Sequence, residues 1–297
     1  MDWLKAIENA IAYIEENLTE EIDYDEIAKQ GFSSKFHFQR VFGILCGYTL
    51  GEYIRFRRLT MAGKELNQTD IKVIDAAIKY GYDSPDSFAK AFTKFHGITP
   101  SAARESGAKL NSFSRLSIKI TLEGGNTMNY RIEKKEALKL LGLKEHFEGS
   151  PADRYNQAHD FSVKGETRFV ACALCGMAED CETLYHVVEN VTDEGYDFTL
   201  CTKVGDFYYK DLNRHIGKYA DMLTTVEIPE MTYVVVQSEK SIYYLRDHME
   251  LRRKVVTDWF PDSGYVIADA PEITFVHSDI KNHSDSFVEI WIPIEKA

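Results

Sequence analysis

The chain is 297 residues long, more than the about 100–200 residues of one ordinary domain, so we expect two domains. Its composition, 44% hydrophobic and 28% charged, is that of a globular protein with a buried core, and no apolar run approaches the ~18–20 residues of a membrane span. The five cysteines are an odd, unpatterned set, which favours a reducing compartment over a disulfide framework. We therefore expect a cytoplasmic protein with no membrane partner.

The net charge of −12 is unevenly distributed, so it does not exclude a nucleic-acid partner. Residues 28–107 hold 12 Lys and Arg against 7 Asp and Glu, a net +5, whereas residues 108–297 hold 22 against 31, a net −9. A basic segment joined to an acidic one indicates that the first half binds nucleic acid.

Helical signals fill the first hundred residues. Apolar residues recur at spacings of three and four between positions 4 and 18, which predicts an amphipathic helix. Asp23, followed three residues later by Glu26, predicts the capped start of a short second helix. An arginine-rich helix is expected from Leu50 to Leu66, and Asp70 is expected to cap the helix after it.

An internal repeat runs through these helices. Each copy has a small Ala, then a Gly for the turn, a Ser to cap the next helix and two Phe to anchor that helix. Two short helices joined in this way form the unit that places its second helix in a DNA major groove. The repeated residues are Ala28, Gly31, Ser34, Phe38 and Phe42 in the first copy, and Ala77, Gly81, Ser84, Phe88 and Phe92 in the second.

The outward residues of each second helix are the candidates for contact with base edges. Arg can pair with guanine, Gln with adenine, and Phe can contact a thymine methyl group, although ordinary solvated helix faces would carry similar residues. Arg55 and Arg58, on the helix between the two units, suit phosphate contacts or bracing of the units. The outward residues are Lys35, Phe36, Gln39 and Arg40 in the first unit, and Pro85, Asp86, Ser87 and Lys90 in the second.

Ser, Asn and Gly cluster around residues 106–128, and Gly124-Gly125 predicts a break there. We therefore place an all-α double helix-turn-helix domain at 1–107, a linker at 108–127 and an α+β domain at 128–297. In the second domain, strand-like runs are mixed with helical runs, which predicts that its strands are largely antiparallel. The expected strands are Phe169–Leu174, Thr232–Gln237, Ile273–Val276 and Phe287–Ile294, and the expected helices are Glu179–Val191 and Tyr244–Phe260.

The last expected strand places a carboxylate between two aromatic side chains. Because side chains alternate across a strand, Phe287, Glu289 and Trp291 share the face opposite the core. Such a carboxylate can bind a lipophilic cation through charge and cation–π contact, although an edge-strand glutamate in water would show the same pattern. Further aromatic residues that either join this site or belong to the core are Tyr233, Trp259 and Phe275.

Four residues invite a zinc interpretation: Cys172, Cys175, Cys181 and His186. A structural zinc site usually has a second clean pair of ligands, which is missing here. Cys172 and Cys175 lie in a strand-like run, where residues three apart face opposite sides. We therefore expect no metal and no cofactor.

Residues 4–105 resemble the DNA-binding domain of the AraC/XylS family. The resemblance rests on GFSSKFHFQRVFGILCGYTLGEYIRFRRLTMAGKEL and VIDAAIKYGYDSPDSFAKAFTKFHGITPSAAR. It implies a seven-helix domain with recognition helices in two successive major-groove segments. It places Phe36, Gln39 and Arg40 at base-reading positions of the first unit, and Asp86, Ser87 and Lys90 at those of the second, where Asp86 departs from the usual neutral or basic residue.

Residues 128–297 resemble the GyrI-like effector-binding domain, with a weaker match over 145–230. The resemblance implies two pseudo-symmetric strand-helix-strand modules around a small-molecule cleft. Glu289 matches the family's buried acidic residue, and Thr274 stands where a second Glu is common. The segments that carry the resemblance are MNYRIEKKEALKLLGLKEHF, IPEMTYVVVQ, VVTDWFPDSGYVIADAPEITF and FVEIWIPI.

The two resemblances together predict a ligand-responsive, sequence-specific transcription regulator without enzymatic activity. Its expected partners are double-stranded DNA and a small lipophilic effector, cationic or neutral, and RNA polymerase is a further candidate. The sequence leaves the oligomeric state and the choice between activation and repression open. The alternative is that the second domain is a hydrolase, with Glu289 and Tyr233 as an acid–base pair, or a protein-binding module.

Overall fold

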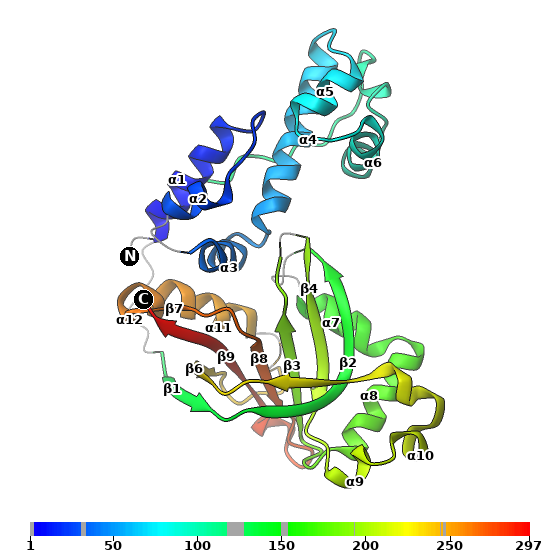
Figure 1. Ribbon diagram of the computed structural model, residues 1–297, viewed down its shortest axis with the longest axis vertical. Helices are drawn as coiled ribbons and strands as arrows, with labels where there is room; N and C mark the ends of the chain where they lie inside the picture. Colours follow the sequence, from blue (N-terminus) through cyan, green and yellow to red (C-terminus); the bar gives the residue numbers. More distant parts are fainter. Residues whose placement is uncertain are drawn as a thin grey trace. The chain divides into compact units, whose positions relative to one another are not determined.

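The computed structural model describes residues 3–30, 34–117, 128–149, 154–192, 194–243, 245 and 248–297 (Figure 1). The chain divides into two compact units, one of residues 1–39 and 50–123 and the other of residues 40–49 and 124–297. Gly31 and Gly124-Gly125, which the sequence assigns to a turn and to the linker, lie outside the described residues. No helix in the described ranges combines the length and the hydrophobicity that crossing a membrane requires.

The regular elements described in the first unit are all helices, as the sequence predicts. One of them, α3, starts in the first unit, and its second half from Arg40 belongs to the second unit. The helices are α1 (Trp3–Glu16), α2 (Tyr24–Gln30), α3 (Lys35–Cys46), α4 (Leu50–Gln68), α5 (Val73–Lys79), α6 (Pro85–His96) and the 3-10 helix η1 (Ala102–Arg104).

Polar side chains cap three helices where the sequence predicts caps. Each side-chain oxygen accepts a hydrogen bond from a backbone N–H of the first turn, which would otherwise have no partner. The pairs are Asp23 Oδ1 with the amide of Asp25 at 2.8 Å, Ser34 Oγ with that of His37 at 3.2 Å, and Ser84 Oγ with that of Ser87 at 3.1 Å.

The predicted cap at Asp70 is wrong. Helix α5 starts at Val73, and its N-cap residue is Lys72, whose side chain makes no capping bond. The preceding helix runs on to Gln68, so Asp70 lies in the middle of a four-residue connection rather than directly before a helix.

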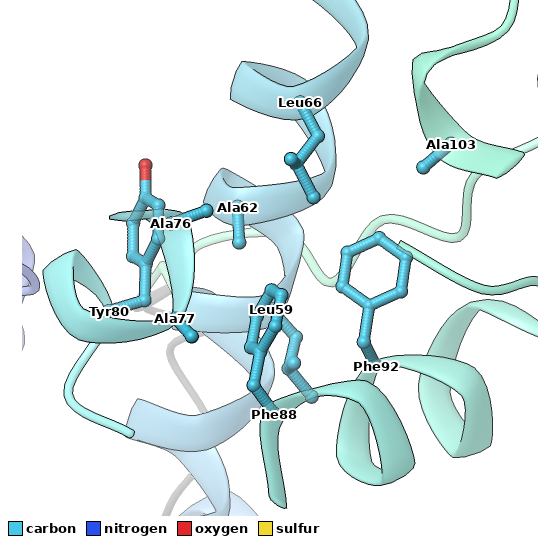
Figure 2. Close-up of a cluster of buried hydrophobic side chains, with 9 residues drawn as sticks. All are labelled: Leu59, Ala62, Leu66, Ala76, Ala77, Tyr80, Phe88, Phe92 and Ala103. Carbon is cyan, nitrogen blue, oxygen red and sulfur yellow. The ribbon is translucent and has the colours of Figure 1, made fainter. Parts of the chain in front are cut away.

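Helices α4, α5 and α6 share one hydrophobic core, which Figure 2 shows. Ala76 and Ala77 have no Cγ, which leaves room for the fully buried rings of Phe88 and Phe92 from α6. In the second copy of the repeat, the small Ala and the two Phe therefore pack together as the sequence predicts. The buried residues of this core are Leu59, Ala62, Leu66, Ala76, Ala77, Tyr80, Phe88, Phe92 and Ala103.

The second unit is an antiparallel sheet with helices, the α+β fold that the sequence predicts. The strands are β1 (Tyr130–Lys135), β2 (Leu138–Glu148), β3 (Thr183–Glu189), β4 (Gly195–Thr202), β5 (Leu223–Ile228), β6 (Met231–Gln237), β7 (Tyr265–Ile267), β8 (Glu272–His277) and β9 (Phe287–Lys296). The α-helices are α7 (Arg154–Val163), α8 (Gly165–Met177), α9 (Asp206–Tyr209), α10 (Leu212–Ile216), α11 (His248–Lys254) and α12 (Phe260–Ser263). The 3-10 helices η3 (Gly217–Met222) and η5 (His283–Asp285) and the π-helix η4 (Val255–Trp259) complete it.

The strand order β1-β6-β9-β8-β3-β4-β2-β5 contains two similar modules, and β7 adds to β9 outside this path. One module runs β2, α7, α8, β3, β4 and the other runs β6, α11, β8, β9. In each module the last strand lies between the other two, and the modules meet where β3 pairs with β8. This arrangement confirms the prediction of two strand-helix-strand modules.

Two predicted elements of this unit have the wrong type. Phe169–Leu174 is part of helix α8, whose buried residues Val170, Leu174 and Met177 follow helical spacing. Glu179–Val191 contains strand β3 instead of a helix. The strand is covered on both faces, so it has apolar residues at 184, 187, 188 and 191, the spacing that is typical of an amphipathic helix.

One face of the sheet carries the helices. Helix α8 packs through Val170 and Leu174 on Leu141 and Leu143 of β2, and α7 packs through Ala158 on the Phe198 side of β4. We call the opposite face, which holds Tyr185, Tyr233, Phe275, Glu289 and Trp291, the aromatic face.

Gly81 offers a test of how the turn of the second helix-turn-helix is held. Its φ is +78°, and an added Cβ would clash with Nη1 of Arg58. Gly97 has nearly the same φ, +76°, with nothing within 4 Å of its Cβ position. We expect Gly81→Ala and Gly97→Ala each to lower the free energy of unfolding by about 1–2 kcal/mol, because alanine is strained in the left-handed backbone conformation. Gly81→Ala should cost about 1 kcal/mol more, because Arg58 must also move away from the new methyl group. Urea titrations of both variants measure this, and equal losses would contradict it.

Candidate DNA-binding helices and effector site

Helix α6 presents the predicted base-reading residues of the second unit to solvent. Asp86, Ser87 and Lys90 are exposed, whereas Phe88 and Phe92 on the other side of the helix are buried in the core. The Ser84 cap and the left-handed Gly97 fix the two ends of the helix. The outward face of α6 therefore has the geometry that insertion into a major groove requires.

Helix α3 places its predicted readers in different environments. Lys35 is exposed, with its ammonium group 5.0 Å from the centroid of the Tyr24 ring. Phe36 and Gln39 are half-buried, and Arg40 is buried. The four residues therefore do not form one exposed face.

Arg40 takes part in a buried ion cluster of the second unit. Its Nη2 donates to Oε2 of Glu272 at 2.9 Å, and Arg252 donates to both carboxylate oxygens of Glu272 at 2.7 and 2.8 Å. All three side chains are at most 4% exposed. Removal of a carboxylate from such a cluster leaves buried guanidinium groups without their counter-charge.

The arginines of α4 divide into an exposed one and two that brace the fold. Arg55 is exposed. Arg57 makes a bidentate ion pair with Glu15 of α1, at 2.7 and 2.8 Å. Arg58 donates to the backbone carbonyls of residues 18 and 20 at 2.9 and 2.8 Å, and burial lowers the pKa of its guanidinium. These bonds match the bracing alternative for Arg58.

The aromatic face brings together side chains from four strands. Phe275 stacks on Trp291 with ring centroids 6.0 Å apart and an interplanar angle of 12°. Tyr185 meets Phe275 edge-on at 5.4 Å, and Tyr233 lies 6.1 Å from Trp291. Tyr233 and Trp291 are buried within this cluster, whereas the rings of Tyr185 and Phe275 are partly exposed.

Glu289 lies in this face, beside Trp291 as the strand pattern predicts. Its Oε2 accepts a hydrogen bond from Nε1 of Trp291 at 3.0 Å, and its Oε1 accepts one from Nη2 of Arg131 at 2.7 Å. The carboxylate is thus held between an indole and a guanidinium.

The other two predicted effector residues, Phe287 and Trp259, lie in different places. Phe287 lies at the edge of the aromatic face, 6.3 Å from Phe275 between ring centroids. Trp259 of η4 has its ring contacts with Tyr130, Phe260 and Tyr265 instead. Thr274, which stands where the family resemblance often has a second Glu, is buried on the helix-covered face, opposite His186 in the strand register.

Sequence reasoning missed Tyr185 and the charged residues of β1. Tyr185 was hidden because its segment was assigned to a helix. Arg131, Glu133 and Lys135 share the aromatic face because they alternate along a strand. The sequence signal that could have identified them is the charge at alternate positions of RIEKK, at residues 131, 133 and 135.

A cavity of about 330 Å³ lies on the helix-covered face. It contains none of the predicted effector residues. Most of its lining is apolar, and it includes Cys172, Cys175 and His186.

Cys172 and Cys175 lie three residues apart on helix α8, not on opposite sides of a strand, and burial raises the pKa of the Cys175 thiol. In the described part of the chain, no group of three or more His, Cys, Asp or Glu has an arrangement that could hold a metal ion.

Two family models match the chain. A helix-turn-helix domain matches residues 27–106, and the GyrI-like small molecule binding domain matches residues 128–295. The chain belongs to the AraC-type transcription regulators with a GyrI-like domain.

Relatives of this AraC-type regulator include transcription activators. The HTH-type transcriptional activator AarP of Providencia stuartii is 45% identical over 38% of this chain and 84% of its own length. The regulatory protein SoxS of Escherichia coli is 38% identical over 35% of this chain and 97% of its own length. Among solved structures, a transcription regulation protein of Staphylococcus aureus is 15% identical with a TM-score of 0.42, over 57% of this chain and 99% of its own.

The buried ion cluster of this GyrI-like unit gives a stability prediction. We expect Glu272→Gln to lower the free energy of unfolding by about 3–5 kcal/mol, because it removes the carboxylate with which the buried Arg252 and Arg40 both pair. The control is Glu250→Gln, which removes the half-exposed pair with Arg253 and should cost at most about 1 kcal/mol. Thermal and urea denaturation measure both, and similar losses would show that the cluster is not a buried charge network.

Proposed function

We propose that this regulator reads DNA with α6 and α3 and that a small lipophilic molecule bound to the aromatic face changes its affinity for DNA. The observation that carries the proposal is the carboxylate of Glu289 held among the rings of Trp291 and Phe275. An apolar site with a few fixed polar groups is the usual form of a small-molecule site.

The DNA-reading role rests on α6 in the first place. Its outward residues Asp86, Ser87 and Lys90 are exposed on a helix that is capped at both ends. Arg40 of α3 is already bonded to Glu272, so a variant of Arg40 would alter the fold as well as any base contact. Helix α6 therefore gives the cleaner experiment.

A sensing role fits the aromatic face better than a hydrolytic one. The strand register puts Tyr233 opposite Pro293, whereas Glu289 lies opposite Gln237, four residues along β9. The tyrosine and the carboxylate therefore do not form an acid–base pair. Burial also raises the pKa of Tyr233 to about 12, which makes it a poor base near neutral pH.

The DNA prediction concerns exposed side chains of α6. We expect Ser87→Ala and Lys90→Ala each to weaken binding to a specific duplex by about 1–3 kcal/mol if the residue contacts a base. The duplex is one that the full chain selects from a random-sequence pool, and fluorescence anisotropy measures the affinity. Lys64→Ala, which removes an exposed charge from α4, is the control and should weaken selected and random duplexes alike. Unchanged selectivity in both α6 variants would refute base reading by this helix.

The effector prediction concerns the stacked rings. We expect Trp291→Ala to weaken binding of the aromatic probe triphenylphosphine oxide by about 1.5–3 kcal/mol, because the ring that stacks on Phe275 is lost. Trp259→Phe is the control, since the ring contacts of Trp259 are elsewhere. Calorimetry measures the affinity, and chromatography should recover the probe unchanged. Equal affinity of the wild type and the Trp291 variant, or conversion of the probe, would contradict the proposal.

A further inference from the structure

We propose that Arg131 sets the ligand class of the aromatic face: it occupies Glu289 as an internal counter-ion, so that the site selects uncharged lipophilic molecules over lipophilic cations. This inference rests on the proposed effector role of the face.

Both oxygens of the Glu289 carboxylate already have a donor. Arg131 Nη2 donates to Oε1 at 2.7 Å and Trp291 Nε1 donates to Oε2 at 3.0 Å. The Glu289 side chain is 12% exposed, whereas the Arg131 side chain is 45% exposed at the edge of the sheet. A ligand cation would therefore have to displace a guanidinium from a partly desolvated, charge-assisted hydrogen bond.

The cation–π position of the face is also filled by the chain itself. The ammonium group of Lys135 lies 4.4 Å from the centroid of the Trp291 ring, within the range of a cation–π contact. The two features that attract a lipophilic cation, a carboxylate and the face of an indole, are thus both occupied by side chains of β1.

The charges at this corner sum to zero. Arg131 Nε donates to Glu133 at 2.6 Å, and Lys135 also pairs with Glu133. Arg131 and Lys135 therefore balance Glu133 and Glu289, which leaves no net negative charge to draw in a cation. An uncharged ligand can pack on the partly exposed rings of Tyr185 and Phe275 without breaking any of these ion pairs.

Tyr233 indicates which polar group such a ligand would carry. Its hydroxyl is buried and has no hydrogen-bond partner among the described residues. A buried hydroxyl without a partner is energetically unfavourable. Since the ring lies 6.1 Å from Trp291, an acceptor atom on a molecule that reaches the inner end of the ring cluster could take this hydrogen bond. The effector class is therefore an uncharged aromatic molecule with a hydrogen-bond acceptor.

The test uses two probes of similar bulk, the cation tetraphenylphosphonium and the uncharged acceptor triphenylphosphine oxide. We expect the full-length wild-type chain to bind the oxide more tightly. Arg131→Gln should raise the affinity for the cation by about tenfold and leave the affinity for the oxide within about twofold. Arg131→Lys keeps the positive charge and should keep the wild-type preference.

A neighbouring lysine gives the matched control. Lys134 lies three residues after Arg131 on β1 but pairs with Glu230, and its side chain is 66% exposed. Lys134→Gln removes the same charge from the same strand and should leave both affinities unchanged. A gain for the cation in this variant as large as in Arg131→Gln would show a general charge effect and overturn the role of Arg131.

A second variant tests the hydrogen bond. We expect Tyr233→Phe to weaken binding of the oxide by about fivefold, and to leave the cation, which has no acceptor, unaffected. Equal loss for both probes would mean that the ring alone matters and would overturn the acceptor assignment.

The remaining outcomes separate this inference from the proposed function. Wild-type binding of the cation as tight as that of the Arg131→Gln variant would overturn the selection by Arg131 while the effector site stands. Binding of either probe that Trp291→Ala does not weaken, or no binding of either probe to any variant, would overturn the effector site itself.

Discussion

The antiparallel pairing of β3 with β8 is the constraint on which the GyrI-like unit depends. It joins two modules that each have only three strands on the central path, and it does so through six residue pairs from Thr183↔His277 to Val188↔Glu272. The register sets Tyr185 opposite Phe275, and the next pair of strands sets Phe275 opposite Glu289. Because a slip of one residue would turn each of these side chains to the other face, the register itself assembles the aromatic face.

The two ends of the sheet are tied to each other by the order of the chain. Strand β5 leads directly into β6 but pairs with β2, and β1 leads directly into β2 but pairs with β6. Leu140 and Val226 at one end therefore share a hydrophobic cluster with Tyr233 and Trp291 at the other. This core packs against the rings on the aromatic face itself, so the rings need little further ordering when a ligand binds.

Sequence patterns predicted the helix-turn-helix region well because its signals are local. Capping by Ser34 and Ser84 depends on residues three positions away, and the buried Phe88 and Phe92 lie one turn apart. The central strand β3 was not predicted, because its local pattern is misleading. Both of its faces are covered, so Val187 and Val188 are buried side by side, and the alternation that marks a strand disappears.

The charges that decide function were the hardest to predict, because their partners are distant in the sequence. The strand pattern found Glu289 and its aromatic neighbours, but Arg131 is 158 residues away, and Glu272 is 232 residues from Arg40. A sequence shows that a carboxylate belongs to a site, whereas only the fold shows whether it is already neutralised. A free Glu289 would favour a cationic ligand, and a paired one removes that preference. The same motif can therefore serve ligands of different charge, and a single arginine on another strand of the sheet is enough to change which class the face accepts.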